Sequence, residues 1–217
     1  MERTRVLIAE DHTIVRQGLS ALLMSESDLE VIGEASDGLE AVELAKNLVP
    51  DVVLMDVAMR NLNGLEATRH IKKILPQIKV LILTMYDNEE IIFQILKAGA
   101  SGYLVKDSAM TDLVSAIRAI QQGNSYLSPS ISKKVIEEYI QRAELGEKGC
   151  SEDLLSSRER EILQLIAEGN SVSQIASLLY ISKKTVEAHK SHIMGKLNIH
   201  DNAGLIKYAI RTGLTKL

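Results

Sequence analysis

Four short apolar segments in the first half of the chain each end on a polar residue, and this feature constrains the fold most. The segments are rich in Val, Ile and Leu and are separated by stretches with helical spacing, which is typical of buried parallel strands. They cover Val6–Ala9, Val52–Met55, Val80–Leu83 and Tyr103–Val105. The polar residues that follow are Glu10 and Asp11, then Asp56, Thr84 and Lys106. Because parallel strands end at one edge of a sheet, where open α/β sheets bind ligands, we expect these side chains to share one pocket.

The first 122 residues alternate between expected strands and expected helices. Strands are expected over 5–9, 30–34, 51–55, 79–83 and 102–105, and helices over 13–25, 37–47, 64–75, 89–98 and 111–122. This alternation predicts an α/β fold with a five-stranded parallel sheet and helices on both faces. Right-handed crossovers between the strands make it doubly wound.

From Leu155 onward the pattern is helical only. Helices are expected over 157–168, 172–179, 183–197 and 202–212, and Ser156 with Glu159 has the spacing of a capping box. A turn at Ile181 and Ser182 precedes the basic helix 183–197, which predicts a small all-α helix-turn-helix domain. We therefore expect three parts: an α/β domain over 1–122, a linker with a short helix over 123–153, and the helical domain over 154–217.

The composition excludes several classes of protein. Cys150 is the only cysteine, so the chain can form no internal disulfide and no cysteine-based zinc site. Aromatic residues make up 3% of the chain, which disfavours base stacking as a binding mode. The first apolar run is too short for a signal peptide or a membrane span, so we expect a cytoplasmic protein with no membrane partner.

The expected pocket has the residues for metal-assisted phosphoryl chemistry. Crowded carboxylates repel each other unless a cation sits among them, and oxygen ligands suit Mg²⁺ or Mn²⁺. Asp56 follows the central strand, where its carboxylate could attack phosphorus. Lys106 and the Thr84 hydroxyl could bind the phosphoryl oxygens. Any one of these residues alone would more often be a helix cap or a solvated side chain, so the prediction depends on the combination.

The first domain resembles a response-regulator receiver domain, which has the flavodoxin-like fold. The matching motifs are Ile8-Ala9-Glu10-Asp11-His12, Val53-Leu54-Met55-Asp56-Val57-Ala58-Met59, Leu83-Thr84 and Gly102-Tyr103-Leu104-Val105-Lys106. The resemblance implies that Asp56 is the phosphoacceptor. It further implies that Asp11, Asp56 and the Ala58 backbone carbonyl hold Mg²⁺, with Glu10 helping through water. Thr84 would be the switch hydroxyl, Lys106 the phosphoryl-binding ammonium, and Tyr103 the switch aromatic.

One position departs from the receiver pattern, and two other functions compete with it. Arg60 stands where the family usually has Pro, so the loop after the phosphoacceptor loses a fixed φ angle. A phosphatase with Asp56 as nucleophile would turn over phosphoesters, but it calls for an acid two residues later, where this chain has Ala58. A binding module regulated without phosphorylation would not need the complete set of acids, Thr84 and Lys106.

The helical domain resembles the LuxR-type DNA-binding domain. The motifs are Leu155-Ser156-Ser157-Arg158-Glu159-Arg160-Glu161-Ile162-Leu163, Ala167-Glu168-Gly169, Ile175-Ala176, Ile181-Ser182-Lys183-Lys184-Thr185-Val186-Glu187-Ala188-His189 and Lys196-Leu197. Val172-Ser173-Gln174 and Asn202 depart from it, where the family often has Asn-x-Glu and Arg. From charge alone, a helical interaction module is an equal alternative. In the DNA-binding reading the helix 183–197 enters the major groove. Phosphate contacts are expected from Lys183, Lys184, Thr185 and Lys190, and base contacts from Glu187, Ala188 and Ser191.

A receiver followed by a LuxR-type domain is the arrangement of the NarL/FixJ subfamily of two-component response regulators. The resemblance implies a transcription regulator rather than a turnover enzyme. A partner histidine kinase would phosphorylate Asp56, and phosphorylation would control dimerisation and binding to double-stranded promoter DNA. The last helix, with Leu205, Ile206 and Ile210, is the expected dimer interface. RNA polymerase is a further expected partner.

Overall fold

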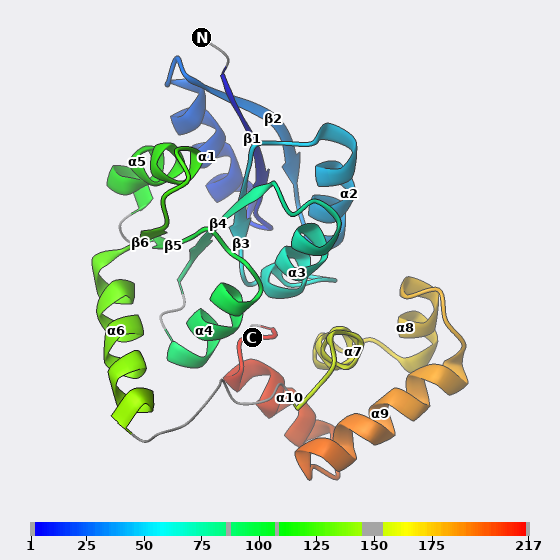
Figure 1. The fold of residues 1–217 in the computed structure, drawn as a ribbon. Helices are drawn as coiled ribbons and strands as arrows, with labels where there is room; N and C mark the ends of the chain where they lie inside the picture. Colours follow the sequence, from blue (N-terminus) through cyan, green and yellow to red (C-terminus); the bar gives the residue numbers. More distant parts are fainter. Residues whose placement is uncertain (1–2, 86–87, 107–108, 145–153, 216–217) are drawn as a thin grey trace.

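The computed structural model of the chain describes residues 3–85, 88–106, 109–144 and 154–215, and it consists of an α/β domain and a helical domain (Figure 1). The strands are β1 (Thr4–Ala9), β2 (Leu29–Ala35), β3 (Val52–Asp56), β4 (Lys79–Thr84), β5 (Gly102–Val105) and β6 (Tyr126–Leu127). The helices of the α/β domain are α1 (Thr13–Met24), α2 (Gly38–Leu48), α3 (Gly64–Ile74), α4 (Glu89–Lys97) and α5 (Ala109–Gln121), and α6 (Pro129–Glu144) follows. The helical domain contains α7 (Ser157–Ala167), α8 (Val172–Leu178), α9 (Lys183–Leu197) and α10 (Asn202–Arg211).

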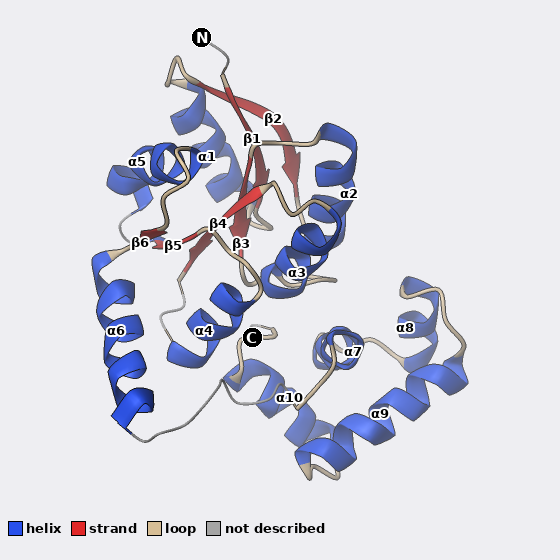
Figure 2. Cartoon of the chain, viewed as in Figure 1, coloured by secondary structure: helices blue, strands red, loops and turns tan. Residues whose placement is uncertain are grey.

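The sheet is parallel, in the order β2-β1-β3-β4-β5-β6, which confirms the predicted doubly wound fold. Each predicted element exists, with ends within two residues of the expected ones. Alternate strand residues face opposite sides, so Val53 and Ile82 pack with α2, α3 and α4, whereas Leu54 and Leu81 pack with α1 and α5. Figure 2 shows the helices on both faces of the sheet.

Among the residues that the structure describes, the sheet has six strands, where the sequence predicts five. The additional strand β6 pairs in parallel with β5, Gly102 with Tyr126 and Tyr103 with Leu127, and it lies in the expected linker. A two-residue strand carries too little apolar pattern to be recognised from sequence. The helix α6 that follows buries Ile131 against the sheet core, so the α/β unit continues past residue 122.

The helices of the helical domain begin at the residues that the sequence predicts and end at the predicted residue or one before it. Ser156 and Glu159 form the expected capping box on α7, and Ser182 caps α9 by accepting a hydrogen bond from the Thr185 amide. Its core contains Ile162, Ile175, Val186, Ile193 and Leu205. Leu205 is fully buried in this core, so it is not available for the dimer interface expected on α10.

The two domains meet along a set of polar side chains that we call the interdomain seam. Asn63, Glu66 and His70 belong to α3 and its N-cap, and they face Arg160, Glu161 and Gln164 of α7. Glu66 pairs with Arg160, and His70 Nε2 lies 3.1 Å from Glu161 Oε1. The last described turn also reaches the α/β domain, since a Cβ on Gly213 would lie 2.3 Å from Ile91 Cδ1 of α4. The helix α9 lies away from this contact (Figure 1).

Candidate functional site

Strand register brings the predicted site residues to one edge of the sheet. Ala9 of β1 pairs with Met55 of β3, so Glu10 and Asp56 follow at the same level. Asp56 in turn pairs with Leu83, one residue before Thr84, and Thr84 pairs with Val105, one residue before Lys106. The alternation of strands and helices thus produces the convergence that the sequence predicts.

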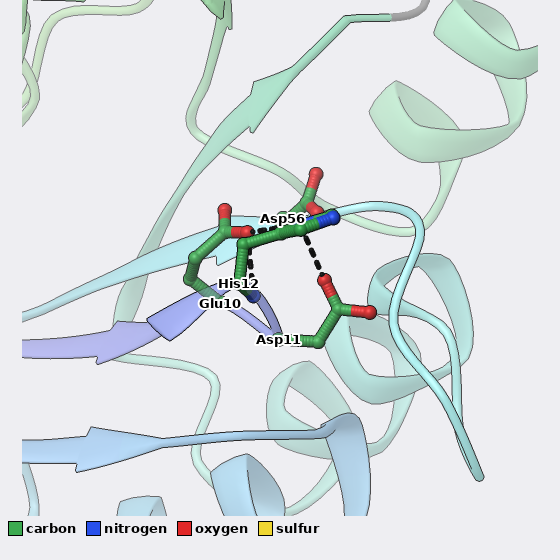
Figure 3. Close-up of side chains that lie close together, drawn as sticks. All are labelled: Glu10, Asp11, His12 and Asp56. Atoms are coloured by element: carbon green, nitrogen blue, oxygen red, sulfur yellow. Dashed lines mark hydrogen bonds and ion pairs between the residues drawn. The ribbon is translucent and has the colours of Figure 1, made fainter. Parts of the chain in front are cut away.

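Glu10, Asp11 and Asp56 form an acidic pocket with Lys106. One ligand atom from each of Glu10, Asp11, His12 and Asp56 lies within 4.8 Å of the others, and Figure 3 shows these four side chains close together. Lys106 Nζ lies 2.7 Å from Glu10 Oε2 and 3.2 Å from Asp56 Oδ2. Glu10 and Asp56 are almost completely buried, so their negative charges are only weakly screened by water.

The charge of the acidic pocket acts on Lys106. Burial alone lowers the pKa of the Lys106 ammonium, but the charge of Asp56 and the hydrogen bond to Glu10 outweigh it and raise the pKa above its usual value. Lys106 therefore stays an ammonium at neutral pH. A fixed cation beside Asp56 is the group that a transferring phosphoryl oxygen would need.

The oxygen donors of the acidic pocket fit a divalent cation of the Mg²⁺ class. Their separations allow one ion to contact several carboxylate oxygens, and carboxylate-only sites with room for water suit Mg²⁺ or Mn²⁺. The Ala58 residue is buried on the loop directly after Asp56, where its carbonyl can belong to the same site. Its predicted role as a ligand, like the roles of Glu10, Asp11 and Asp56, stays a prediction.

Thr84 is the last residue of β4, Tyr103 lies on the neighbouring strand β5 opposite Ile82, and both are fully buried. The Tyr103 ring packs in the core on the α4 side of the sheet, in a cluster that includes Ile131 of α6. The sequence predicts that Tyr103 turns inward on signalling. In this structure the ring is already inside, and an outward turn would have to displace the chain that covers it.

Two residues near the acidic pocket have contacts that the sequence motifs did not reveal. His12 Nδ1 lies 3.0 Å from Glu10 Oε1 and 2.9 Å from Asp11 Oδ1. Arg16 donates from Nη1 to the Glu10 carbonyl at 2.6 Å and from Nε to Glu34 at 3.3 Å. Both fix the turn between β1 and α1. The position of His12 directly after the acid pair was the available signal.

The helix α9 presents the predicted DNA-contacting residues to solvent. The side chains of Lys183, Lys184, Thr185, Glu187, Ala188 and Ser191 are exposed, and Lys190 is half-buried. Tyr180, in the turn before α9, is 95% exposed with a φ of 53°, and the sequence motifs did not single it out. Val186 and Ile193 hold the opposite face in the core. The exposed face of α9 is therefore accessible while the two domains are in contact.

Family models match both parts of the chain. The family described as "Response regulator receiver domain" matches residues 6–118, and the one described as "Bacterial regulatory proteins, luxR family" matches residues 153–209. The described part of the chain contains no helix long and apolar enough to cross a membrane.

Similar proteins cover nearly the whole chain. The Oxygen regulatory protein NreC of Staphylococcus epidermidis is 41% identical over 97% of this chain and 98% of its own. The Transcriptional regulatory protein DegU of Brevibacillus brevis is 36% identical over 99% and 96%. The Salmonella typhimurium RcsB response regulator has a solved structure with a TM-score of 0.67 and 30% identity, covering 98% of this chain and 99% of its own. A structure of an RcsB–DNA complex, covering 95% and 98%, has a TM-score of 0.59 at 30% identity. The chain belongs to the two-component response regulators of the NarL/FixJ type, with a receiver domain and a LuxR-type DNA-binding domain that serves transcription regulation.

Proposed function

We propose that a partner histidine kinase phosphorylates Asp56 and that this phosphorylation controls dimerisation and promoter binding. The observation that carries the proposal is the position of Lys106 Nζ, 3.2 Å from Asp56 Oδ2 at the shared edge of the sheet. A carboxylate next to a fixed ammonium is arranged to accept a phosphoryl group and to neutralise its charge.

The transfer step follows from the chemistry of the two side chains. An oxygen of Asp56 attacks the phosphorus of a phosphohistidine, the P–N bond breaks, and the imidazole leaves with the electron pair and takes up a proton. Lys106 binds a phosphoryl oxygen as the new acyl phosphate forms. A divalent ion held by Glu10, Asp11, Asp56 and the Ala58 carbonyl would neutralise charge on the phosphoryl group when bound.

The signal would leave the acidic pocket through Thr84 and Tyr103. Thr84 would hydrogen-bond a phosphoryl oxygen, and the space that its side chain leaves would favour the inward position that the Tyr103 ring already has in this structure. Because Tyr103 shares a cluster with Ile91 of α4 and Ile131 of α6, its packing is linked to both helices. These helices and β5 are thus the elements whose surface would change.

DNA recognition would use the exposed face of α9. Lys183, Lys184 and Lys190 would contact phosphates, together with Thr185 at the helix N-terminus, and Glu187, Ala188 and Ser191 would contact bases. The modest basic charge favours two copies on the DNA. Leu205 is buried in the helical domain, so Ile206 and Ile210 are the two residues of the expected α10 interface that could still pair with a second copy. Both line a cleft of about 580 Å³ between the domains. Pairing through them therefore requires that the cleft opens.

The phosphorylation step can be tested with phosphoramidate as a small phosphoryl donor. The intact chain should gain one phosphoryl group in intact-protein mass spectrometry, and Asp56→Ala should gain none. Glu30→Gln is the matched control, because Glu30 is an exposed acid near the start of β2, at the end of the sheet opposite to the acidic pocket. Incorporation that survives Asp56→Ala would contradict the proposal.

The DNA-binding step can be tested with a duplex selected from a random-sequence pool by the intact chain. Lys184→Ala should weaken binding to all sequences and reduce the slope of log affinity against log salt by about one. Lys133→Ala removes a similarly exposed cation from α6 and should leave the slope unchanged. Equal salt slopes for the two variants would mean that Lys184 does not contact a DNA phosphate.

A further inference from the structure

The side chain of Gln164 connects the DNA-binding domain to the loop that follows the phosphoacceptor. Gln164 comes from α7 and is completely buried in the interdomain seam. Its Oε1 accepts hydrogen bonds from the backbone N–H and from Nδ2 of Asn63, both at 3.0 Å. Its Nε2 donates to the Met59 carbonyl at 3.0 Å and to Glu168 Oε1 at 2.8 Å. All the hydrogen-bonding positions of the amide nitrogen are therefore used.

The orientation of this amide follows from its partners. A backbone N–H can only donate and a backbone carbonyl can only accept, so Oε1 must face Asn63 and Nε2 must face Met59. A carboxylate could replace only the first contact, and an ammonium only the second. Glutamine is the side chain of this length that satisfies both, which indicates a specific fit rather than a general polar contact.

Other polar groups of the loop over residues 57–63 have partners in the loop itself, at Asp37 and Gly38, and at Glu168. Gly64 N donates to the Val57 carbonyl at 2.8 Å, and Asn63 Oδ1 accepts from Glu66 N at 2.9 Å as the N-cap of α3. The Met59 carbonyl and the Asn63 N–H receive their partner from the other domain. The loop thus has its complete set of hydrogen bonds only while α7 is in place.

The sequence of this loop leaves its backbone conformation less restricted, so a contact from the other domain can help to fix it. Arg60 lacks the fixed φ angle that a proline would impose, so the chain between Met59 and Asn61 has more freedom to lose on ordering. The Met59 carbonyl lies one peptide unit after the Ala58 carbonyl that we expect to face the metal. A bond that fixes the Met59 carbonyl therefore restricts the peptide that precedes it.

We propose that Gln164 is a positioning residue that completes the phosphoacceptor loop, so that contact between the domains favours metal binding and phosphorylation at Asp56. The inference rests on the proposed function and adds its regulation by the output domain. Coupling of this kind is reciprocal: if the docked domain strengthens metal binding, metal binding strengthens docking by the same factor. The DNA-binding domain then acts on the receiver as well as responding to it.

The seam offers a matched control for this idea. His70 joins the same two helices through its contact with Glu161, but it lies on α3 beyond the loop. His70→Ala weakens the docking without removing a partner of Met59 or Asn63. Gln164→Leu keeps a similar volume and leaves both backbone groups without that partner. A difference between these variants separates positioning of the loop from loss of docking in general.

The experiment uses the full chain and two measurements. Hydrogen–deuterium exchange over residues 57–63 in metal-free protein should be at least about tenfold faster in Gln164→Leu, since about 1.4 kcal/mol corresponds to tenfold. The dissociation constant for Mg²⁺, measured by calorimetry, should rise several-fold. Both values should change less in His70→Ala than in Gln164→Leu, because His70→Ala leaves the partner of Met59 and Asn63 in place.

Three outcomes decide the inference. Unchanged exchange and unchanged Mg²⁺ affinity in a folded Gln164→Leu variant would overturn it. Equal effects of Gln164→Leu and His70→Ala would also overturn it, because docking alone would then account for them. Labelling by phosphoramidate distinguishes failure of this inference from failure of the proposed function. If the parent chain gains no phosphoryl group, the proposed function is contradicted. If the parent and Gln164→Leu are labelled at equal rates, only the inference is contradicted.

Discussion

The acidic pocket and the interdomain seam are both clusters of buried charged side chains, but their charges are balanced differently. In the pocket, Glu10 and Asp56 share the ammonium of Lys106. In the seam, Glu66 contacts both Arg160 and Arg69, and Glu161 contacts Arg158 and His70. The pocket has one ammonium for the carboxylates of Glu10, Asp11 and Asp56. The two carboxylates of the seam have three guanidinium groups as neighbours, those of Arg69, Arg158 and Arg160.

This difference teaches how to distinguish a binding site from a structural joint. Where several buried carboxylates share too few cations, binding of a further cation lowers the free energy of the folded protein. The carboxylates of the seam are paired with arginines of both domains, and their effect is to hold two elements in one relative position. The pocket is therefore expected to respond to metal and the seam to mutation and pH.

The largest effect is expected from removing one partner of the buried pair between Glu66 and Arg160. Glu66→Ala leaves the Arg160 guanidinium without that carboxylate, which should weaken the docked arrangement by about 3–5 kcal/mol. The domains should separate, and small-angle scattering should record a larger radius of gyration. Glu66→Gln keeps an acceptor and should separate less. An unchanged radius for Glu66→Ala would mean that other contacts hold the seam.

The next effect tests the charge imbalance of the acidic pocket. Mg²⁺ at about 100 times its dissociation constant should stabilise the folded chain by about 2.7 kcal/mol, seen as a rise in the melting temperature. Asp11→Asn removes a ligand charge from the cluster and should reduce the rise. His70→Ala, a change in the seam, should retain it. A rise of the same size in Asp11→Asn would exclude Asp11 as a ligand.

A smaller effect is expected on the pH dependence of the free energy of unfolding when Glu161 of the seam is changed. Burial raises the pKa of Glu161, but hydrogen bonds from His70 and Arg158 outweigh it and hold the pKa below its usual 4.5. Its contribution to stability is therefore complete above pH 4.5 and is lost as the pH falls through the lowered value. In urea unfolding, Glu161→Gln should lose less stability than the parent on acidification through this range. The difference should be about 1 kcal/mol, since His70 is partly exposed.

Glu66 should give the opposite slope in the same measurement. Burial, the largest influence on this carboxyl, raises its pKa despite the nearby Arg69. Its contribution is present below the unfolded pKa and is lost as the pH rises through the folded one. Glu66→Gln should therefore lose less stability than the parent as the pH rises through that range. Parallel slopes for the Glu66 and Glu161 variants would contradict these assignments.

The smallest effect is expected on the exposed face of α9. Lys183→Ala should change the free energy of unfolding by no more than about 0.5 kcal/mol, because its side chain is exposed. The same variant should lose affinity for selected duplex DNA. A clear fall in the melting temperature would instead assign Lys183 a structural role.

The acidic pocket was predictable from sequence because its geometry follows from strand order. Glu10, Asp56, Thr84 and Lys106 each follow an apolar run, and parallel pairing leaves them no other place than one edge. The caps at Ser156 and Ser182 were predictable for a similar reason, since a cap is local. Contacts that depend on neighbours in sequence, or on sheet register, can be read before a structure exists.

The seam was not predictable, because its partners lie about a hundred residues apart and belong to separate domains. Gln164 and Asn63 are separated by 101 positions, and neither sits in a periodic pattern that marks it. Arg160 and Glu161 look like ordinary charges of a helix surface until α3 covers them. Leu205 was placed at an interface for the same reason: helical spacing reveals an apolar face but not which partner buries it.

The two-residue strand β6 has a practical consequence for handling the receiver alone. A fragment ending at residue 122 would lack Leu127 and Ile131, and the edge of β5 would lose its hydrogen-bonding neighbour. Unpaired strand edges pair readily with other chains, so such a fragment is expected to aggregate. A fragment that continues to the end of α6 keeps that edge covered and Tyr103 packed. Solubility of the isolated receiver is thus decided by residues that a motif search assigns to the linker.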